Sequence, residues 1–226
     1  MKTFTPYLEI LPEAQKYFWK KLSPCKDLGF VLYGGTAIAL QLGHRISIDF
    51  DFFSHFPLDK KKEEELLTAL PFLKDARLVQ SELNSRSYIT SNKVQFSFFG
   101  DIRLGRINEP RNTEDGVLQI ASLDDLMALK LVTVMKRIEA KDYQDIAAML
   151  RNGIDLEKGL GGAVALYGKQ FSPSESVRTL TYFQGGDLEN LSMMDRNTLL
   201  HVTQNLLLHA LPRIEKVSES LTLENG

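Results

Sequence analysis

The sequence predicts an α/β (α+β) protein: a mixed β-sheet with flanking helices, followed by a C-terminal helical bundle. Up to about residue 120, short apolar runs that end in turn residues alternate with amphipathic segments. Beyond Ser122 the apolar residues recur only at helical spacing. We therefore expect two domains, an α/β domain over residues 1–120 and a helical domain over residues 121–226 that completes the functional cleft.

The composition is that of an ordinary globular protein. The chain has 226 residues, of which 43% are hydrophobic and 25% are charged, and its formal net charge is −2. A nucleic-acid partner would therefore have to bind a local basic patch. The single cysteine, Cys25, excludes an internal disulfide. No apolar run has the length of a signal peptide or a membrane span, so we expect a cytoplasmic protein.

Hydrophobic periodicity and turn residues predict the elements of the first half. Gly43 is expected to end one helix and Asp59 to cap another. In order, we expect a helix at 11–22, a buried strand at 29–35, a helix at 36–44, a strand at 47–54, a helix at 57–73, an antiparallel meander at 76–83, 85–91 and 93–100, a surface connection at 100–116 and a short strand at 117–122.

The second half is expected to contain helices only. Ser122 and Asp125 have the spacing of a capping box, and Asn152-Gly153 is a typical helix end. The expected helices cover residues 122–138, 140–153, 155–168, 172–183 and 195–217.

Two carboxylates, Asp49 and Asp51, stand inside the strand predicted at 47–54. Side chains two apart on a strand share a face and lie about 7 Å apart along the backbone. Ile48, Phe50 and Phe52 would then point into the core, and we also expect Phe53 to be a core residue. Two like charges held close together repel unless a cation lies between them, and Mg²⁺ meets this need with carboxylates and substrate phosphates. The alternative is a solvated face with incidental charges.

A diglycine, Gly34-Gly35, separates the preceding strand from the next helix. Glycine at a strand end lets backbone N–H groups approach an anion, and the start of a helix favours negative charge. Thr36 could add a hydroxyl donor. A simple turn is the alternative, but the diglycine and the acidic pair in one strand–helix–strand unit together favour phosphate chemistry.

The segment from Gly34 to Phe53 resembles the first motif of the AbiEii/AbiGii toxin family of nucleotidyltransferases, within the DNA polymerase β-like superfamily. The matching residues are G-G-T, a short helix and H-R-x-S-x-D-F-D-F-F. The resemblance implies a nucleotidyltransferase fold in which Asp49 and Asp51 bind Mg²⁺. It also implies that Gly34, Gly35 and Thr36 hold the phosphates of an NTP and that Arg45 and Ser47 orient them.

A second group of charged residues lies at 130–145. Without the resemblance, the simplest interpretation is a pair of solvated helices. Family members carry a lysine, an arginine about seven residues later and a K-D-x-x-D sequence, which are matched here by Lys130, Arg137 and Lys141-Asp142-Tyr143-Gln144-Asp145. The resemblance implies that Lys130, Asp142 and Asp145 belong to the catalytic site and that Arg137 and Lys141 contact the nucleotide. Which of the two aspartates matters more stays open.

One departure from the superfamily concerns a third carboxylate, which usually stands on a later strand. The strand at 93–100 offers Gln95 and Ser97 instead, and Asp101 follows its end.

We expect an Mg²⁺-dependent enzyme that transfers a nucleoside monophosphate from an NTP to an acceptor hydroxyl. A tRNA end is the leading acceptor, an aminoglycoside or a protein hydroxyl is another, and a cognate antitoxin would be the partner of such a toxin. The rival hypothesis is a catalytically weak protein that binds a nucleotide or a partner.

Overall fold

The computed structural model describes residues 2–204 and 206–222, and the chain divides into two compact units. The first unit comprises the residues up to Gly105, residues Glu109–Ala121 and the segment from Glu219. The second unit comprises Arg106–Asn108 and Ser122–Ser218. The predicted fold class, a mixed sheet with flanking helices followed by a helical part, is confirmed. That the helical residues complete a cleft stays a prediction. Within the described ranges, no helix is long and apolar enough to cross a membrane.

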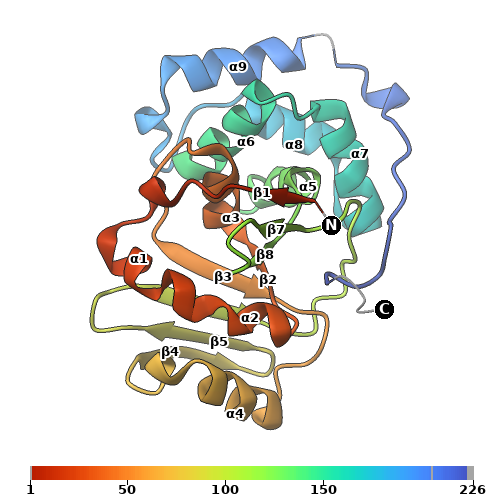
Figure 1. The fold of residues 1–226 in the computed structure, drawn as a ribbon. Helices are drawn as coiled ribbons and strands as arrows, with labels where there is room; N and C mark the ends of the chain where they lie inside the picture. Colours follow the sequence, from red (N-terminus) through yellow and green to blue (C-terminus); the bar gives the residue numbers. More distant parts are fainter. Residues whose placement is uncertain (1, 205, 223–226) are drawn as a thin grey trace. The chain divides into compact units, whose positions relative to one another are not determined.

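The first unit is built on an eight-stranded sheet with the order β1-β7-β8-β2-β3-β6-β5-β4 (Figure 1). Strand β3 pairs antiparallel with β2 and parallel with β6, so the sheet is mixed at its centre. The expected meander β4-β5-β6 is antiparallel throughout. The strands are β1 (Thr3–Phe4), β2 (Val31–Tyr33), β3 (Asp49–Phe53), β4 (Arg77–Glu82), β5 (Ser85–Ile89), β6 (Gln95–Phe99), β7 (Arg111–Thr113) and β8 (Gln119–Ile120).

One face of this sheet carries an aromatic core. Phe50 and Phe52 of β3 stack on Phe96 and Phe98 of β6, with ring centroids 5.4 and 5.1 Å apart, and all four are fully buried. Phe18 of the first helix contacts Phe96 at 5.3 Å and closes this face. The helices of the unit are α1 (Glu13–Trp19), α2 (Pro24–Asp27), α3 (Gly34–Leu42) and α4 (Lys60–Ala69), with the 3₁₀ turns η1 (Leu8–Ile10), η2 (Lys20–Leu22) and η3 (Pro71–Leu73).

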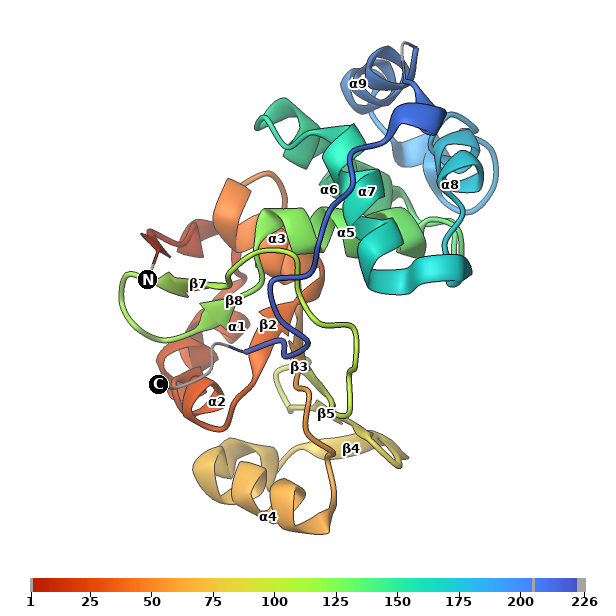
Figure 2. The ribbon, with the colours of Figure 1, turned by 90° about the vertical axis from the view of Figure 1, so that its right-hand side faces the viewer.

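Helix α4 packs against the meander at one end of the sheet (Figure 2). Asp59 caps its first turn by accepting a hydrogen bond from the Lys62 N–H, as its position in the sequence predicts. Glu63 accepts a hydrogen bond from Tyr88 at 3.0 Å and pairs with Arg86 at 2.9 Å, and both partners stand on β5. Strand β4 is the outer strand beyond β5, and its six residues are exposed.

The second unit is a bundle of helices. Helix α5 packs against α6 and α7, and α9 packs against α6 and α8. Ser122, Asp155, Ser172 and Ser192 each cap a helix with a side-chain oxygen. The helices are α5 (Leu123–Thr133), α6 (Ala140–Arg151), α7 (Leu156–Tyr167), α8 (Pro173–Leu180) and α9 (Met193–Thr203), with η4 (Gly168–Gln170), η5 (Leu188–Asn190) and η6 (Leu208–Ala210).

Several details differ from the sequence-based expectation. The helix expected at 11–22 continues as a 3₁₀ turn after Trp19, and α3 begins at Gly34 instead of Thr36. The connection at 100–116 contains strand β7, which pairs with the unpredicted strand β1. The helix expected at 195–217 ends at Thr203 and is followed by the separate 3₁₀ turn Leu208–Ala210. Leu211 precedes a proline and has non-helical backbone, so no helix continues to residue 217. Residue 205 of that segment lies outside the described residues.

Two of the core predictions are wrong in part. Ile48 precedes β3 and is 59% exposed, because the aromatic packing begins only at Phe50. Phe53 is half-buried and stacks on Tyr33, with centroids 4.7 Å apart. It shares the sheet face of Asp49 and Asp51, not that of Phe50 and Phe52.

Candidate active site

The two predicted metal ligands lie on one face of β3. Asp49 and Asp51 are half-buried and alternate with the fully buried Phe50 and Phe52, so the pleat directs both carboxylates away from the aromatic core. The antiparallel partner strand places Tyr33 opposite Asp51, immediately before the diglycine. The acidic pair and the diglycine therefore belong to neighbouring strands.

Gly34 brings the backbone into direct contact with Asp51. Its φ is +75°, in the left-handed region, and a Cβ built on it would lie 2.5 Å from Asp51 Oδ2. Only glycine fits this position, both for its backbone conformation and for the space that the carboxylate occupies. Helix α3 starts here, and its N-cap residue, Tyr33, makes no side-chain capping bond. The first-turn N–H groups of Gly34 and Gly35 thus suit an anion beside the carboxylates.

Thr36 and Ser47 hold the two elements of the site together. The Thr36 hydroxyl is 2.8 Å from Ser47 Oγ and also donates to the backbone carbonyl of Asp49. Both residues are buried, so these contacts fix the start of β3 against α3. Arg45 Nη1 donates to the carbonyl of Ile46 at 3.0 Å. In this arrangement the two hydroxyls connect the start of β3 to α3. Their contact with phosphate stays a prediction.

The position of a third metal ligand is taken by neutral residues. Strand β6 places Gln95 beside Asp49 and Ser97 beside Asp51 in parallel register. Ser97 Oγ accepts hydrogen bonds from Ser87 at 3.1 Å and from Gln95 at 3.2 Å. Among the residues that the structure describes, no three histidine, cysteine or acidic side chains are grouped to hold a metal. Two carboxylates still suit Mg²⁺, which takes its other ligands from phosphates and water.

The second predicted cluster forms inside the helical unit. Lys130 of α5 is buried and lies 2.6 Å from Asp142 Oδ1 and 2.6 Å from Asp145 Oδ2, both on α6. The two carboxylates stand three residues apart and share one helix face, as expected. Arg137 Nε binds Asp142 Oδ2 at 2.8 Å from the connection between the helices. The structure therefore unites Lys130, Arg137, Asp142 and Asp145.

Charge within this cluster is balanced. Burial by itself would raise the pKa of Asp142, but the hydrogen bonds and charges of Arg137 and Lys130 together hold that pKa below its ordinary value. Lys141 points elsewhere: it pairs with Glu139 at 2.8 Å and is half-exposed. Glu139 also lies 3.5 Å from Arg137. Glu139 was not among the predicted site residues, although its place between Arg137 and Lys141 in the sequence indicates an ion pair with one of them.

A strand, a diglycine, a short helix and a strand with two same-face carboxylates define a site of the nucleotidyltransferase type. The sequence comparison gives the family. Residues 25–198 match the model described as "Nucleotidyl transferase AbiEii toxin, Type IV TA system", and the chain belongs to this family. Because the chain belongs to this family, it is a nucleotidyltransferase. An uncharacterised protein of Aquifex aeolicus (strain VF5) is 30% identical over 164 residues, which are 72% of this chain and 77% of that protein.

Solved structures support the same fold. The nucleotidyltransferase toxin MenT4 of Mycobacterium tuberculosis superposes with a TM-score of 0.56 at 13% identity and covers 87% of this chain and 84% of its own. An antigenic nucleotidyltransferase-like protein of Paracoccidioides brasiliensis gives a TM-score of 0.51 at 17% identity, with 78% and 89% coverage. At these identities the likeness concerns the fold alone.

Proposed function

We propose that this chain transfers a nucleoside monophosphate from an NTP to an acceptor hydroxyl in a Mg²⁺-dependent reaction. The acceptor oxygen forms a bond to the α-phosphorus while the bond from that phosphorus to the bridging oxygen breaks, and pyrophosphate leaves with the electron pair. The acceptor proton passes to solvent or to a phosphate oxygen. The observation that carries the proposal is the approach of the Asp51 carboxylate to Gly34 at the start of α3.

Each part of the site has a proposed task. Asp49 and Asp51 would hold Mg²⁺, which supplies positive charge to the triphosphate and the leaving group. Gly34 and Gly35 would bind phosphate oxygens through their N–H groups. Thr36 and Ser47 would position Asp49 through the bonds already described.

The basic residues of the motifs complete this assignment. Arg45, Arg137 and Lys141 would orient the charged substrate. Lys130, Asp142 and Asp145 would act as one unit, since the two carboxylates fix the ammonium group and reduce its net charge.

We further propose a tRNA end as the acceptor, a cytoplasmic location, and a cognate antitoxin that neutralises the activity. The family description, a type IV toxin–antitoxin system, supports the antitoxin. A tRNA acceptor rests on the sequence resemblance and on the chemistry of a terminal hydroxyl group.

The test is incubation of the purified chain with each labelled NTP, Mg²⁺ and total tRNA. We expect label in the RNA fraction, reduced at least about 100-fold in Asp49→Asn and in Asp51→Asn because the metal would lose an anionic ligand. Asp75→Asn, an exposed carboxylate of the same unit, is the matched control and should keep full activity. Unchanged transfer in both active-site variants would disprove the metal assignment.

A second candidate, a nucleotide- or partner-binding protein with weak turnover, is favoured by Gln95 and Ser97 in the place of a third carboxylate. Nucleotide binding by the wild-type chain that depends on Asp51, without transfer to RNA, to an aminoglycoside or to a protein, would support this candidate.

A further inference from the structure

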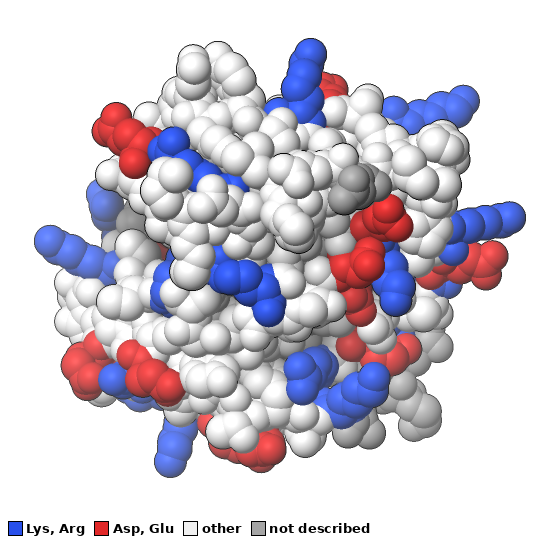
Figure 3. Space-filling view, turned by 90° about the horizontal axis from the view of Figure 1, so that it is seen from above, with Lys and Arg blue, Asp and Glu red and all other residues white. Residues whose placement is uncertain are grey.

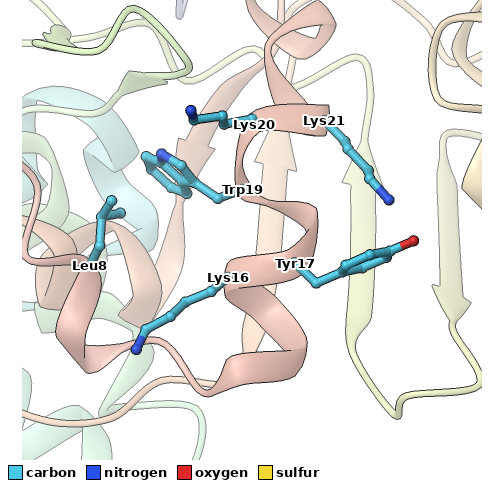
Figure 4. A pocket seen from close by; sticks show the side chains of 6 residues that line it. All are labelled: Leu8, Lys16, Tyr17, Trp19, Lys20 and Lys21. Atoms are coloured by element: carbon cyan, nitrogen blue, oxygen red, sulfur yellow. The ribbon is translucent and has the colours of Figure 1, made fainter.

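A cavity of about 330 Å³ lies beside helix α1 in the first unit. Its lining combines lysine side chains with aromatic and aliphatic ones, and none of these residues belongs to the proposed active site. The lining residues are Leu8, Lys16, Tyr17, Trp19, Lys20 and Lys21. In Figure 4, Leu8 and Trp19 lie between Lys16 and Lys20, while Tyr17 and Lys21 project from the other side of the helix.

The cavity has a fixed apolar floor. Trp19 is 3% exposed, and its indole N–H donates to Asp115 at 2.7 Å. Burial by itself would raise the pKa of Asp115, but the hydrogen bonds from Trp19, Thr113 and the Val117 N–H outweigh it and keep that pKa below its ordinary value. The carboxylate thus stays charged and is engaged with Trp19. Phe18 anchors α1 to the sheet through Phe96 of β6 and also contacts Phe72 of η3.

The rim of the cavity is basic. Residues 14–26 contain four lysines and no acidic residue, although the whole chain has a net charge of −2. Lys16 pairs with the exposed Glu13, but neither Lys20 nor Lys21 has a carboxylate partner within the described residues. Acidic residues flank this segment at Glu9, Glu13 and Asp27. On the face drawn in Figure 3, by contrast, lysine and arginine are interspersed with aspartate and glutamate.

Tyr17 adds an exposed aromatic surface. Its residue is 61% exposed, and the Lys21 ammonium lies 3.4 Å from the centre of one ring face. An exposed ring held by a cation is suited to stacking of a nucleobase, while the lysines on the other side of the same helix bind flanking phosphates.

We propose that the α1 surface, defined by Leu8, Lys16, Tyr17, Trp19, Lys20 and Lys21, binds a single-stranded segment of the acceptor RNA. This inference rests on the proposed function and names a binding site apart from the reacting groups. Helix α1 covers the aromatic face of the sheet, whereas Asp49 and Asp51 are on the opposite face. The α1 surface is therefore an anchor for RNA and does not contact the reacting phosphate. Its affinity should depend on salt, because lysine–phosphate contacts release counterions.

The test measures binding of a labelled, unstructured RNA oligonucleotide to the full chain by fluorescence anisotropy across a salt series. In the triple variant Lys16→Glu/Lys20→Glu/Lys21→Glu we expect at least about tenfold weaker binding at 0.1 M salt, and a slope of log K against log salt that is smaller in magnitude by about 2. Tyr17→Ala should weaken binding roughly fivefold or more with an unchanged slope, since it removes stacking only.

The matched control is Lys60→Glu/Lys61→Glu/Lys74→Glu, three exposed lysines of the same unit with the same change in net charge. It should change the affinity less than threefold. Equal losses in both triple variants would overturn the proposal. Melting temperatures within a few degrees of wild type confirm that each variant is folded.

Transfer kinetics separate this inference from the proposed function. If the α1 triple variant raises KM for RNA without changing KM for NTP, both proposals are supported. If the wild-type chain transfers label and the α1 triple variant has the same KM for RNA, only the RNA anchor fails. If the wild-type chain binds RNA through the α1 surface but transfers nothing to any acceptor, only the proposed activity fails.

Discussion

At the scale of single residues, Gly34 is the most constrained position of the candidate site. Its φ is positive, and a side chain there would place its Cβ 2.5 Å from Asp51 Oδ2, so both the backbone and the space exclude any other residue. Gly34→Ala should therefore displace Asp51 or distort the first turn of α3. We expect transfer activity to fall at least about 100-fold and stability to fall by about 1–3 kcal/mol, measured by urea unfolding.

Gly116→Ala is a suitable control for that substitution. Gly116 also has a positive φ, of +72°, but a Cβ there would meet nothing within 4 Å. It should therefore lose stability through backbone strain alone and keep its activity. An active Gly34→Ala variant would show that the contact with Asp51 is not needed for the reaction.

At the scale of elements, the ion cluster joins helix α5 to helix α6. Lys130 is buried against Asp142 and Asp145, so its removal would leave two carboxylates without their shared cation. We expect Lys130→Ala to lower the free energy of unfolding by about 3–5 kcal/mol at pH 7. Adding Asp145→Asn to this variant should restore part of the stability, because one buried charge is removed. A Lys130→Ala variant with wild-type urea unfolding would contradict a structural role for the cluster.

The elements of the site were predictable from local patterns, and their contacts were not. The alternation in Asp49–Phe53 fixes which side chains share a face, and Gly43, with φ +65°, ends α3 where the sequence places the end. Strands β1 and β7 are two and three residues long, too short for a periodic signal. Lys130 stands twelve residues before Asp142, so their pairing depends on how α5 and α6 pack, which the sequence pattern alone leaves open.

At the scale of the whole molecule, the chain passes between the two units after Gly105, Asn108, Ala121 and Ser218. The short segment Arg106–Asn108 is held within the second unit by Asp125. The Asp125 carboxylate accepts hydrogen bonds from the Ile107 N–H at 2.8 Å, from the Asn108 N–H at 3.2 Å and from the Ser122 hydroxyl at 2.5 Å. One buried side chain thus ties the segment to the start of α5.

Burial raises the pKa of Asp125 to about 6, although its hydrogen bonds act in the opposite direction. The folded state then binds this proton more tightly than the unfolded state, whose pKa is about 3.9. The resulting stabilisation is fully present below about pH 4 and is lost as the pH rises through about 6. Relative to Asp125→Asn, the free energy of unfolding of the wild-type chain should fall between pH 4 and 7. Parallel pH curves for the two proteins would contradict this assignment, and Asp75→Asn is the control that should follow the wild type.

Strand β2, which leads into the diglycine, lies between β3 and β8, and β8 is almost ninety positions further along the chain, at Gln119–Ile120. During translation, the edge of β2 that pairs with β8 therefore stays unpaired until Ile120 has left the ribosome. A nascent chain shorter than this has both aspartates of β3 but lacks the strand that pairs with β2 beside the diglycine. Ribosome-bound fragments of this toxin family member should consequently be vulnerable to proteases and chaperone-dependent well after the acidic motif has been synthesised.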